Sequence, residues 1–521
     1  MSRLALRTAV LSGAMAAMAA IATLVQQGRA NAIERDTFVD SSGRARPFRD
    51  TYLDWFGEKR RRPHLLRATI EDVGVAGLGV LHYWVQRHAN QSDWDQPSPV
   101  DRFTLRAVRF DNNLFTTNNI LHPLAGAAYY GMPRVNGFDP HEAFLAVLVA
   151  STFWEFALEW REKVSINDLI VTPVGGMVIG EFLFQLGEYV TSAPGRGLAQ
   201  EIAAVTLGAP RRAHDAFDRP RKPAPLPPDA LGFSSAFWHR FRLASGATAV
   251  SNDAGKEARL QNIVAEAQIV SVPGFLDPGR FHLLFGEGNF TELRLRMEVT
   301  DDGLEDFDLW LEADIVGYYS QRIEPASHGQ AGHGVLVAFA NAFRDADRWV
   351  LGRRDQLAVA HFAAAVGRLW FGAGGLWLRL GADLSGDFAS VRSLAFEPWI
   401  LRNGIDGTKT VLSKQGYYFA LGYSARLRAV ASYRGIEVGG HLAYGDYGSI
   451  DGLDRWQEQV SRDVGGDDQI LEYGAWIQAR LPWLPVVARA SSDQVVRWSR
   501  LEKIRDSRWD RRMTATLGLQ F

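Results

Sequence analysis

The chain has 521 residues, which is enough for two or three domains. It carries 57 Lys and Arg against 59 Asp and Glu, and this balance argues against a nucleic-acid-binding protein, which normally shows a basic excess. The chain holds no Cys, which excludes disulfides, zinc–thiolate sites and cysteine nucleophiles. Its 11% aromatic residues and 50 Gly favour a β-rich envelope protein.

Residues 1–32 have the pattern of a secretory signal peptide. Arg3 and Arg7 make a basic start, and residues 8–25 are apolar. The segment Ala30-Asn31-Ala32 then offers the small-x-small pattern of a cleavage site. We therefore expect export, and an exported chain without Cys fits a Gram-negative envelope protein.

A charged, irregular segment follows at residues 33–62, and we expect it to be a flexible arm. A helical module is predicted over residues 63–209, because apolar residues recur with helical spacing at 65–89, 142–162 and 173–190. Thr172 is expected to cap the last of these helices ahead of Pro173, and Asn118 or Asn119 an earlier one. Gly176 and Gly180 would give that last helix a flat face for a neighbour.

A linker is predicted over residues 210–236. Six Pro lie between positions 210 and 228. Pro lacks the backbone N–H and fixes φ, so we expect neither a helix nor a central strand there. The linker would separate the helical module from the second half of the chain.

The second half, residues 237–521, alternates apolar and polar residues in many short segments. In the last ten residues, apolar side chains stand at positions 513, 515, 517, 519 and 521. A period of two places them on one face of a strand. About ten residues suit a tilted membrane-spanning strand, and at about 24 residues per strand and turn this half holds roughly 12 strands. We predict an α+β multidomain protein, with a C-terminal antiparallel transmembrane β-barrel after the helical module.

The chain ends on Phe521, which resembles the terminal signal of bacterial outer-membrane barrels. We therefore expect location in the outer membrane, with two partners: outer-membrane lipid, and the barrel-assembly machinery acting through this last strand. Nucleic acid is not an expected partner.

Polar residues interrupt the apolar helices of the module. Ser151, Glu155 and Glu159 are spaced i, i+4, i+8 and would share one helix face. An unpaired buried carboxylate costs several kcal/mol, so each needs a partner, a proton or a metal. The candidate catalytic residues are His122, Glu155, Glu159 and Asp168. The candidate ligand or network residues are Asn118, Asn119, Ser151, Ser165, Thr172 and Glu181.

A purely structural interpretation stands beside this one. Ser165 and Asp168 have the spacing of a capping box, and His122 before Pro123 could cap a helix. Glu155 and Glu159 could pair with Arg134, Arg161 or Lys163. We predict no metal site, because the cluster holds one His and no recognised ligand spacing, and no cofactor, because nucleotide-binding and hydrolase motifs are missing from the sequence.

Short polar motifs are concentrated over about residues 100–205. They are Asp111-Asn112-Asn113, Thr117-Asn118-Asn119, His122-Pro123, Asn136-Gly137-Phe138, Trp154-Glu155-Phe156 with Glu159, and Ser165-Ile166-Asn167-Asp168-Leu169 with Thr172-Pro173-Val174-Gly175-Gly176. As a group they resemble a bacterial envelope family catalogued as a domain of unknown function, number thirty-nine forty-three. The resemblance implies association with the outer membrane and no established activity. It does not extend to the barrel half.

Our leading interpretation is an outer-membrane barrel of unassigned activity. Its periplasmic helical module would plug, gate or brace it, from the periplasm or from within the lumen. One alternative is a lipid-modifying or lipid-hydrolysing enzyme that uses the His/Glu/Asp cluster, and a second is a solute channel. The sequence leaves open whether the protein is an enzyme.

Overall fold

The computed structural model describes residues 36–56, 63–85, 96–195, 197–220, 222–324, 330–348, 353–454, 460, 463–481 and 483–521. The predicted signal peptide lies outside these residues. The helices are α2 Phe48–Trp55, α3 Leu65–Val85, α4 Pro99–Phe103, α5 His122–Val135, α6 Pro140–Phe153, α7 Asp168–Thr191, α8 Leu198–Thr206, α9 Ala209–Asp218, α10 Phe396–Asn403 and α11 Thr410–Gln415, with π-helical turns η2 Thr117–Leu121 and η3 Trp154–Leu158.

The strands fall into a small N-terminal group and a long C-terminal series. They are β1 Thr37–Val39, β2 Ala45–Pro47, β3 Val108–Arg109, β4 Val164–Ser165, β5 Trp238–Asn252, β6 Glu257–Val270, β7 Gly279–Phe285, β8 Phe290–Thr300, β9 Gly303–Ile323, β10 Gln330–Arg348, β11 Arg353–Ala373, β12 Leu376–Val391, β13 Tyr418–Tyr433, β14 Ile436–Ser449, β15 Gly466–Arg480, β16 Val486–Leu501 and β17 Ile504–Gln520.

Twelve of the described strands, β5, β6 and β8 to β17, close into an antiparallel barrel. Each pairs with the next along the chain, and β17 pairs with β5 from Asp510↔Asn252 to Gln520↔Arg242, which leaves no open edge. The fold class and the strand number predicted from the sequence are confirmed. We refer to the end of the barrel where β5 begins and β17 ends as the proximal end. The distal end carries the long β12–β13 and β14–β15 connections.

Strand alternation sets the two faces of the barrel wall. On β17, Met513, Leu517 and Leu519 are exposed, whereas Arg512 and Thr516 are buried. The outward face is therefore apolar and the inward face polar, as a period of two requires.

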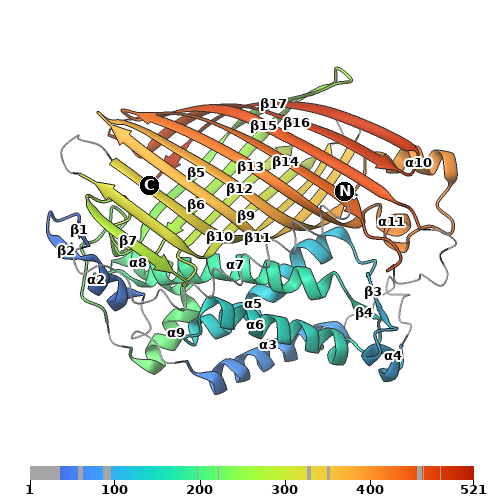
Figure 1. Ribbon diagram of the computed structural model, residues 1–521, viewed down its shortest axis with the longest axis horizontal. Coiled ribbons are helices and arrows are strands. Elements are labelled where there is room, and N and C mark those ends of the chain that lie inside the picture. The colour runs from blue at the N-terminus through green and yellow to red at the C-terminus, as the bar shows by residue number, and fades with distance from the viewer. Residues whose placement is uncertain are drawn as a thin grey trace.

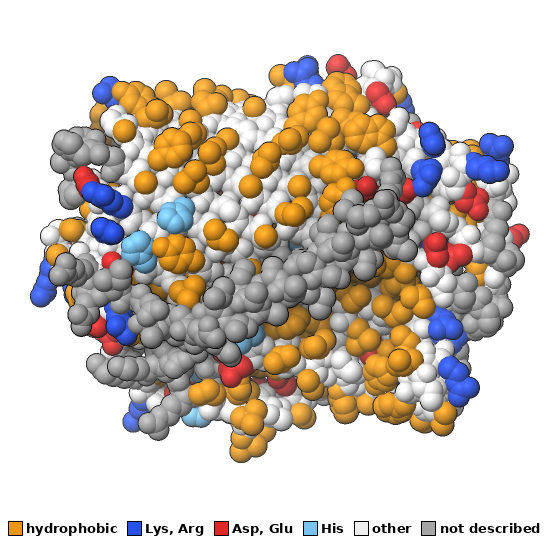
Figure 2. Space-filling model, viewed as in Figure 1, with side chains coloured by type: hydrophobic (Ala, Val, Ile, Leu, Met, Phe, Trp, Pro, Cys, Tyr) orange, Lys and Arg blue, Asp and Glu red, His pale blue; other side chains and the backbone are white. Residues whose placement is uncertain are grey.

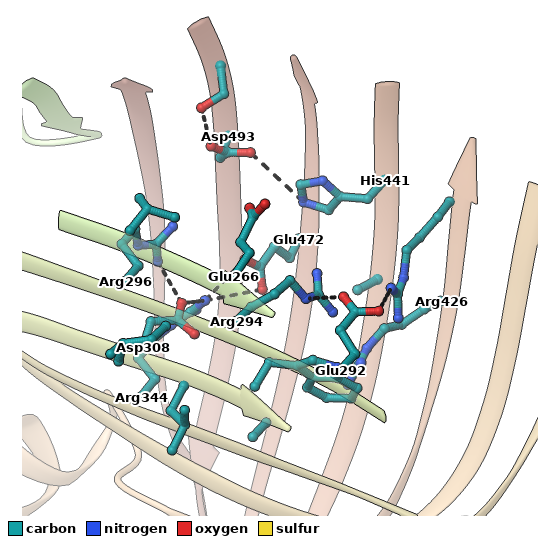
Figure 3. Close-up of a pocket in the computed structure, with 18 of the residues that line it drawn as sticks. Glu266, Glu292, Arg294, Arg296, Asp308, Arg344, Arg426, His441, Glu472 and Asp493 are labelled. Carbon is teal, nitrogen blue, oxygen red and sulfur yellow. Dashed lines mark hydrogen bonds and ion pairs between the residues drawn. The ribbon is translucent and has the colours of Figure 1, made fainter. Parts of the chain in front are cut away.

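Charged side chains cross the lumen in opposite-sign pairs (Figure 3). Arg344 on β10 bonds both Asp308 on β9 and Glu472 on β15, at 3.0 Å each. Arg489 on β16 reaches Glu266 on β6 at 3.2 Å. These side chains line a cavity of about 420 Å³. Pairing satisfies charges that would otherwise be costly to enclose.

A layer of helices covers the outside of one part of the wall (Figure 1). This helical layer consists of α3, η2–α5, α6–η3 and α7. Its core includes outward-facing side chains of the wall, among them Leu311 and Ala313 on β9, Phe339 on β10 and Ala360 on β11. The neighbouring positions on these strands, such as Trp310 and His361, line the lumen instead. The helices of this layer therefore lie against the outer wall and not within the barrel.

Glycines allow the two inner helices of the layer to touch. A Cβ atom on Gly126 of α5 would lie 2.0 Å from the Thr172 carbonyl oxygen of α7, and one on Gly176 would lie 2.5 Å from the Gly126 backbone. Gly180 is packed against the ring of Tyr130 in the same way. The flat face predicted at Gly176 and Gly180 is confirmed.

Three local predictions are wrong. The described part of the 33–62 arm forms β1, β2 and α2, because β1 pairs with β7 and Phe48 stacks on Phe281 at 3.9 Å. The 210–236 linker begins with α9, since Pro210 falls in the first helical turn, where a missing N–H costs nothing. The predicted caps are wrong as well: Thr172 lies inside α7, which starts at Asp168, and Asn118 and Asn119 lie inside η2 and do not cap α5.

Candidate functional site

A polar cluster lies at the distal end of the helical layer, at its interface with the barrel. The cluster forms where α5 and α7 both begin, next to η2, η3 and the segment that follows β3. Tyr417, directly before β13, joins it from the barrel side: its hydroxyl accepts a hydrogen bond from Asn118 Nδ2 (3.0 Å) and donates one to the Asn113 carbonyl (2.9 Å). We refer to Asp111, Asn118, His122, Glu155, Ser165, Asn167 and Asp168 as the distal cluster.

Asp111 lies at the centre of this cluster and is almost fully buried. Its carboxylate accepts hydrogen bonds from Asn118 Nδ2 (2.7 Å) and Asn113 Nδ2 (2.9 Å), while its backbone N–H donates to Asn167 Oδ1 (3.1 Å). Amide donors hold the carboxylate in place without neutralising its charge.

Asp168, the first residue of α7, faces His122, the first residue of α5. The distance from His122 Nε2 to Asp168 Oδ1 is 3.5 Å, which is long for a hydrogen bond. Asn167 Nδ2 donates to the same Asp168 oxygen at 2.9 Å. His122 Nε2 is a buried atom without a hydrogen-bond partner among the described residues, and so is Asn118 Oδ1.

Glu155 brings a third carboxylate to the cluster. It is 2% exposed, and its Oε2 accepts the Ser165 backbone N–H at 2.8 Å. The carboxylates of Glu159, Asp168 and Asp111 repel it electrostatically. The cluster therefore concentrates negative charge in a site of low solvent access, where each such charge is costly.

Not all of the predicted site residues reach the distal cluster. Ser151 touches it, with its hydroxyl donating to the Asp168 carbonyl at 3.2 Å. Glu159 is turned aside by the π-helical turn η3 and accepts a hydrogen bond from Trp154 Nε1 at 3.0 Å. Asn119 accepts a hydrogen bond from Ser390 Oγ on β12 at 2.9 Å, and Thr172 packs at the helix crossing.

Glu181 belongs to a second cluster, about 20 Å further along α7 at 1.5 Å per residue. Its two oxygens accept hydrogen bonds from Tyr130 Oη (2.6 Å), Arg134 Nε (2.8 Å), Arg134 Nη2 (2.9 Å) and Gln185 Nε2 (2.7 Å). We refer to Tyr130, Arg134, Glu181 and Gln185 as the proximal cluster. One carboxylate and one guanidinium neutralise each other there, so Arg134 is the partner of Glu181 and not of Glu155 or Glu159.

The sequence did not single out Asp111, Asn167 or Tyr417 as site residues. Asp111 and Asn167 belong to the polar motifs that carried the family resemblance. Their place in these motifs was the sequence feature that could have marked them as site residues. Tyr417 is 299 residues from its partner Asn118, and no local pattern links them.

The distal cluster has the composition of a cation site, although the sequence predicted none. Asp111, His122 and Asp168 each offer one ligand atom, and these three atoms lie within 4.8 Å of one another. The sequence could not show that Asp111 joins the His122–Asp168 pair.

The segment that follows β14 contacts Phe110, the residue before Asp111. The Phe110 backbone N–H donates to the Leu453 carbonyl at 2.6 Å, and Phe110 forms a β-bridge with Asp454. Burial raises the pKa of Asp454 to about 7, with Asp463 and Asp451 adding to the effect and Lys409 opposing it.

The helices and the distal cluster correspond to a known sequence family. Residues 107–209 match a family model described as a domain of unknown function (DUF3943). The match runs from β3 to α8 and contains every residue of the distal cluster, whereas Tyr417 lies outside it. It confirms the resemblance seen in the sequence motifs. No curated protein is similar enough to count as a match.

Solved bacterial barrels resemble the C-terminal half at very low identity. A loop-deletion mutant of OmpT from Vibrio cholerae has 7% identity and a TM-score of 0.20, covering 55% of this chain and 99% of that one. An anion-selective porin from Comamonas acidovorans has 12% identity and a TM-score of 0.17, covering 55% and 99%. The evidence for the barrel is its own strand registers, because TM-scores this low support no argument.

Proposed function

We propose that this protein is an outer-membrane β-barrel that carries its helical layer within the membrane, where the layer braces one side of the wall. The observation behind the proposal is the packing of apolar helices on the outward faces of β9, β10 and β11. Of the plug, gate and brace expected from the sequence, the brace fits this geometry. A plug would need helices in the lumen.

The helices have the dimensions and surface of membrane segments. Two of the described helical stretches, Pro140–Leu158 and Asp168–Thr191, are long and apolar enough to cross a membrane. Only 22% of the window in the first is buried, so most of its apolar surface faces outward. Exposed apolar residues on this outer side include Leu145, Leu148, Val149 and Phe153.

Both the helical layer and the barrel expose apolar surface. Hydrophobic side chains are spread over both on the face in view in Figure 2. On the barrel, Leu427 and Leu442 are outward-facing and exposed. Apolar surface on both parts suits a lipid environment better than water.

The lumen supports a scaffold better than an open channel. Cross-lumen ion pairs such as Arg344–Glu472 and Arg428–Glu312 join strands on different parts of the wall. We therefore expect planar-bilayer conductance at baseline, whereas steady ion currents would favour the channel.

Lipid exposure of the helical layer can be tested by site-specific labelling, since the chain has no native Cys. Leu148→Cys on α6, Leu427→Cys on β13 and Asp302→Cys in the β8–β9 turn would each carry an environment-sensitive fluorophore. In vesicles with spin-labelled acyl chains, we expect quenching at 148 and 427 and none at 302. Quenching at 427 without quenching at 148 would contradict the intramembrane brace.

A lipid-acting enzyme is the second candidate, because His122 is 22% exposed between the exposed apolar residues Leu121 and Leu124. A substrate could approach the site from lipid. The catalytic set would shrink to His122, Glu155 and Asp168, because Glu159 faces Trp154. Envelope lipid profiles that are equal for wild type and Glu155→Gln would count against catalysis.

A further inference from the structure

The distal cluster places three potential metal ligands around one point. One carboxylate oxygen each from Asp111 and Asp168 and one ring nitrogen of His122 lie within 4.8 Å of one another. Ligand bonds of about 2.0–2.2 Å to a divalent cation put two ligand atoms at most about 4.4 Å apart. Closing the site around an ion therefore needs side-chain shifts of less than about 1 Å.

Two unpartnered atoms in the cluster are an independent sign of a ligand. Asn118 has no solvent exposure, yet its Oδ1 has no hydrogen-bond partner among the described residues. Its Nδ2 holds Asp111, so the unpartnered oxygen belongs to a side chain already fixed at the site. His122 Nε2 is also buried and lacks such a partner. A buried polar atom without a hydrogen-bond partner is costly, and a cation would satisfy both atoms.

The surrounding groups orient the ligands as an outer shell does in metal sites. Asn113 and Asn118 donate to the Asp111 carboxylate, and Asn167 donates to the Asp168 carboxylate. Glu155 lies nearby, and its carboxyl group accepts a hydrogen bond from the Ser165 backbone N–H. Hydrogen-bonded carboxylate ligands of this kind are typical of preorganised sites.

The donor set selects the class of ion. An imidazole nitrogen with carboxylate oxygens suits Zn²⁺ or Mn²⁺, whereas Ca²⁺ and Mg²⁺ favour oxygen-only sites. We propose that Asp111, His122 and Asp168 bind one divalent transition-metal ion, with Asn118 Oδ1 available as a further ligand. This site does not depend on where the helical layer lies relative to the membrane.

The test uses the full chain in detergent, without an oligohistidine tag and stripped with a chelator. Titration calorimetry with Zn²⁺ or Mn²⁺ is expected to show one ion per chain, bound at micromolar or lower concentration. Asp111→Asn and His122→Gln should each weaken binding at least tenfold. His441→Gln removes a lumenal His that lies 4.0 Å from Asp493, and it should leave the affinity unchanged.

A spectroscopic measurement covers the case in which a variant fails to fold. Pulsed electron paramagnetic resonance of Mn²⁺ bound to the wild-type protein should show modulation from an imidazole nitrogen. Absence of that modulation, absence of saturable binding of both ions, or equal affinity in folded Asp111→Asn and His122→Gln would overturn the proposal.

Discussion

The two polar clusters of the helical layer have similar sequence settings and opposite electrostatics. In the proximal cluster, Glu181 is matched by Arg134, and its oxygens accept four hydrogen bonds. In the distal cluster, three carboxylates meet one imidazole, and two buried acceptors lack partners among the described residues. A network whose charges and hydrogen bonds are satisfied within the protein stabilises the fold. A network of carboxylates without a matching arginine or lysine, in which buried polar atoms lack hydrogen-bond partners, is suited to binding a ligand.

In the barrel lumen, as in the proximal cluster, buried carboxylates are paired with arginines. Arg344 joins Asp308 and Glu472 (Figure 3), and Arg489 joins Glu266. Burial of charge alone therefore does not mark a functional site in this protein. The balance of charge around each buried group separates the distal cluster from the others.

The largest expected effect comes from unbalancing the proximal cluster. Arg134→Met leaves Glu181 as a buried carboxylate without its guanidinium partner, which should cost about 3–5 kcal/mol. Thermal unfolding followed by far-ultraviolet circular dichroism would measure the loss. Arg134→Met combined with Glu181→Leu should recover most of it, and the exposed Arg402→Met serves as a neutral control. Equal losses in the single and double variants would contradict the pairing.

Replacing the Glu155 carboxyl in the distal cluster should raise the stability of the protein instead of lowering it. Glu155→Gln keeps an acceptor for the Ser165 N–H and removes repulsion from Asp111 and Asp168. In the presence of a chelator, we expect the variant to be more stable than wild type by about 1–3 kcal/mol. Glu142→Gln, at the capping box of α6, should give no such gain. If Glu155→Gln melts at a lower temperature than wild type in the presence of a chelator, then Glu155 stabilises the fold as Glu181 does, and the contrast between the two clusters is wrong.

A smaller loss is expected at the contact between the distal cluster and the barrel. Tyr417→Phe removes the hydroxyl that links Asn118 and Asn113, which should cost about 1 kcal/mol. The exposed Tyr433→Phe is the matched control. Hydrogen exchange should rise in η2 for Tyr417→Phe alone, and unchanged exchange would show that the helical layer holds the cluster without this contact.

The smallest effect should be a local pH dependence at the segment that follows β14. Because the pKa of Asp454 is raised to about 7 in the folded protein, the folded state holds its proton more tightly than the unfolded chain does. The stability of this segment should therefore fall as the pH rises from about 4 to about 7. Hydrogen exchange of the Phe110 amide would report it, and Asp454→Asn should remove the pH dependence. A dependence that survives in the variant belongs to another group.

Local periodicity in the sequence was sufficient for the architecture. The period of two in residues 237–521 predicted the barrel, because alternating apolar and polar residues place all apolar side chains on one face of a strand and all polar ones on the other. Helical spacing located α3, α6 and α7, and the close glycine pair on α7 marked its contact face. Errors arose where a single residue type was given too much weight, as with Pro210 at the start of α9.

The tertiary structure alone decided where the helices lie and which carboxylates matter. The outward side chains of a barrel strand are apolar whether they contact lipid or an apolar helix. The sequence pattern therefore could not show that the helical layer lies outside the wall. Glu155 and Glu181 both lie in apolar helical sequence, yet Arg134 bonds the carboxylate of Glu181, whereas Arg102 bonds the backbone carbonyl of Glu155. Partners such as Tyr417 and Asn118 come from distant parts of the chain, and contacts of that kind exist only once the chain has folded.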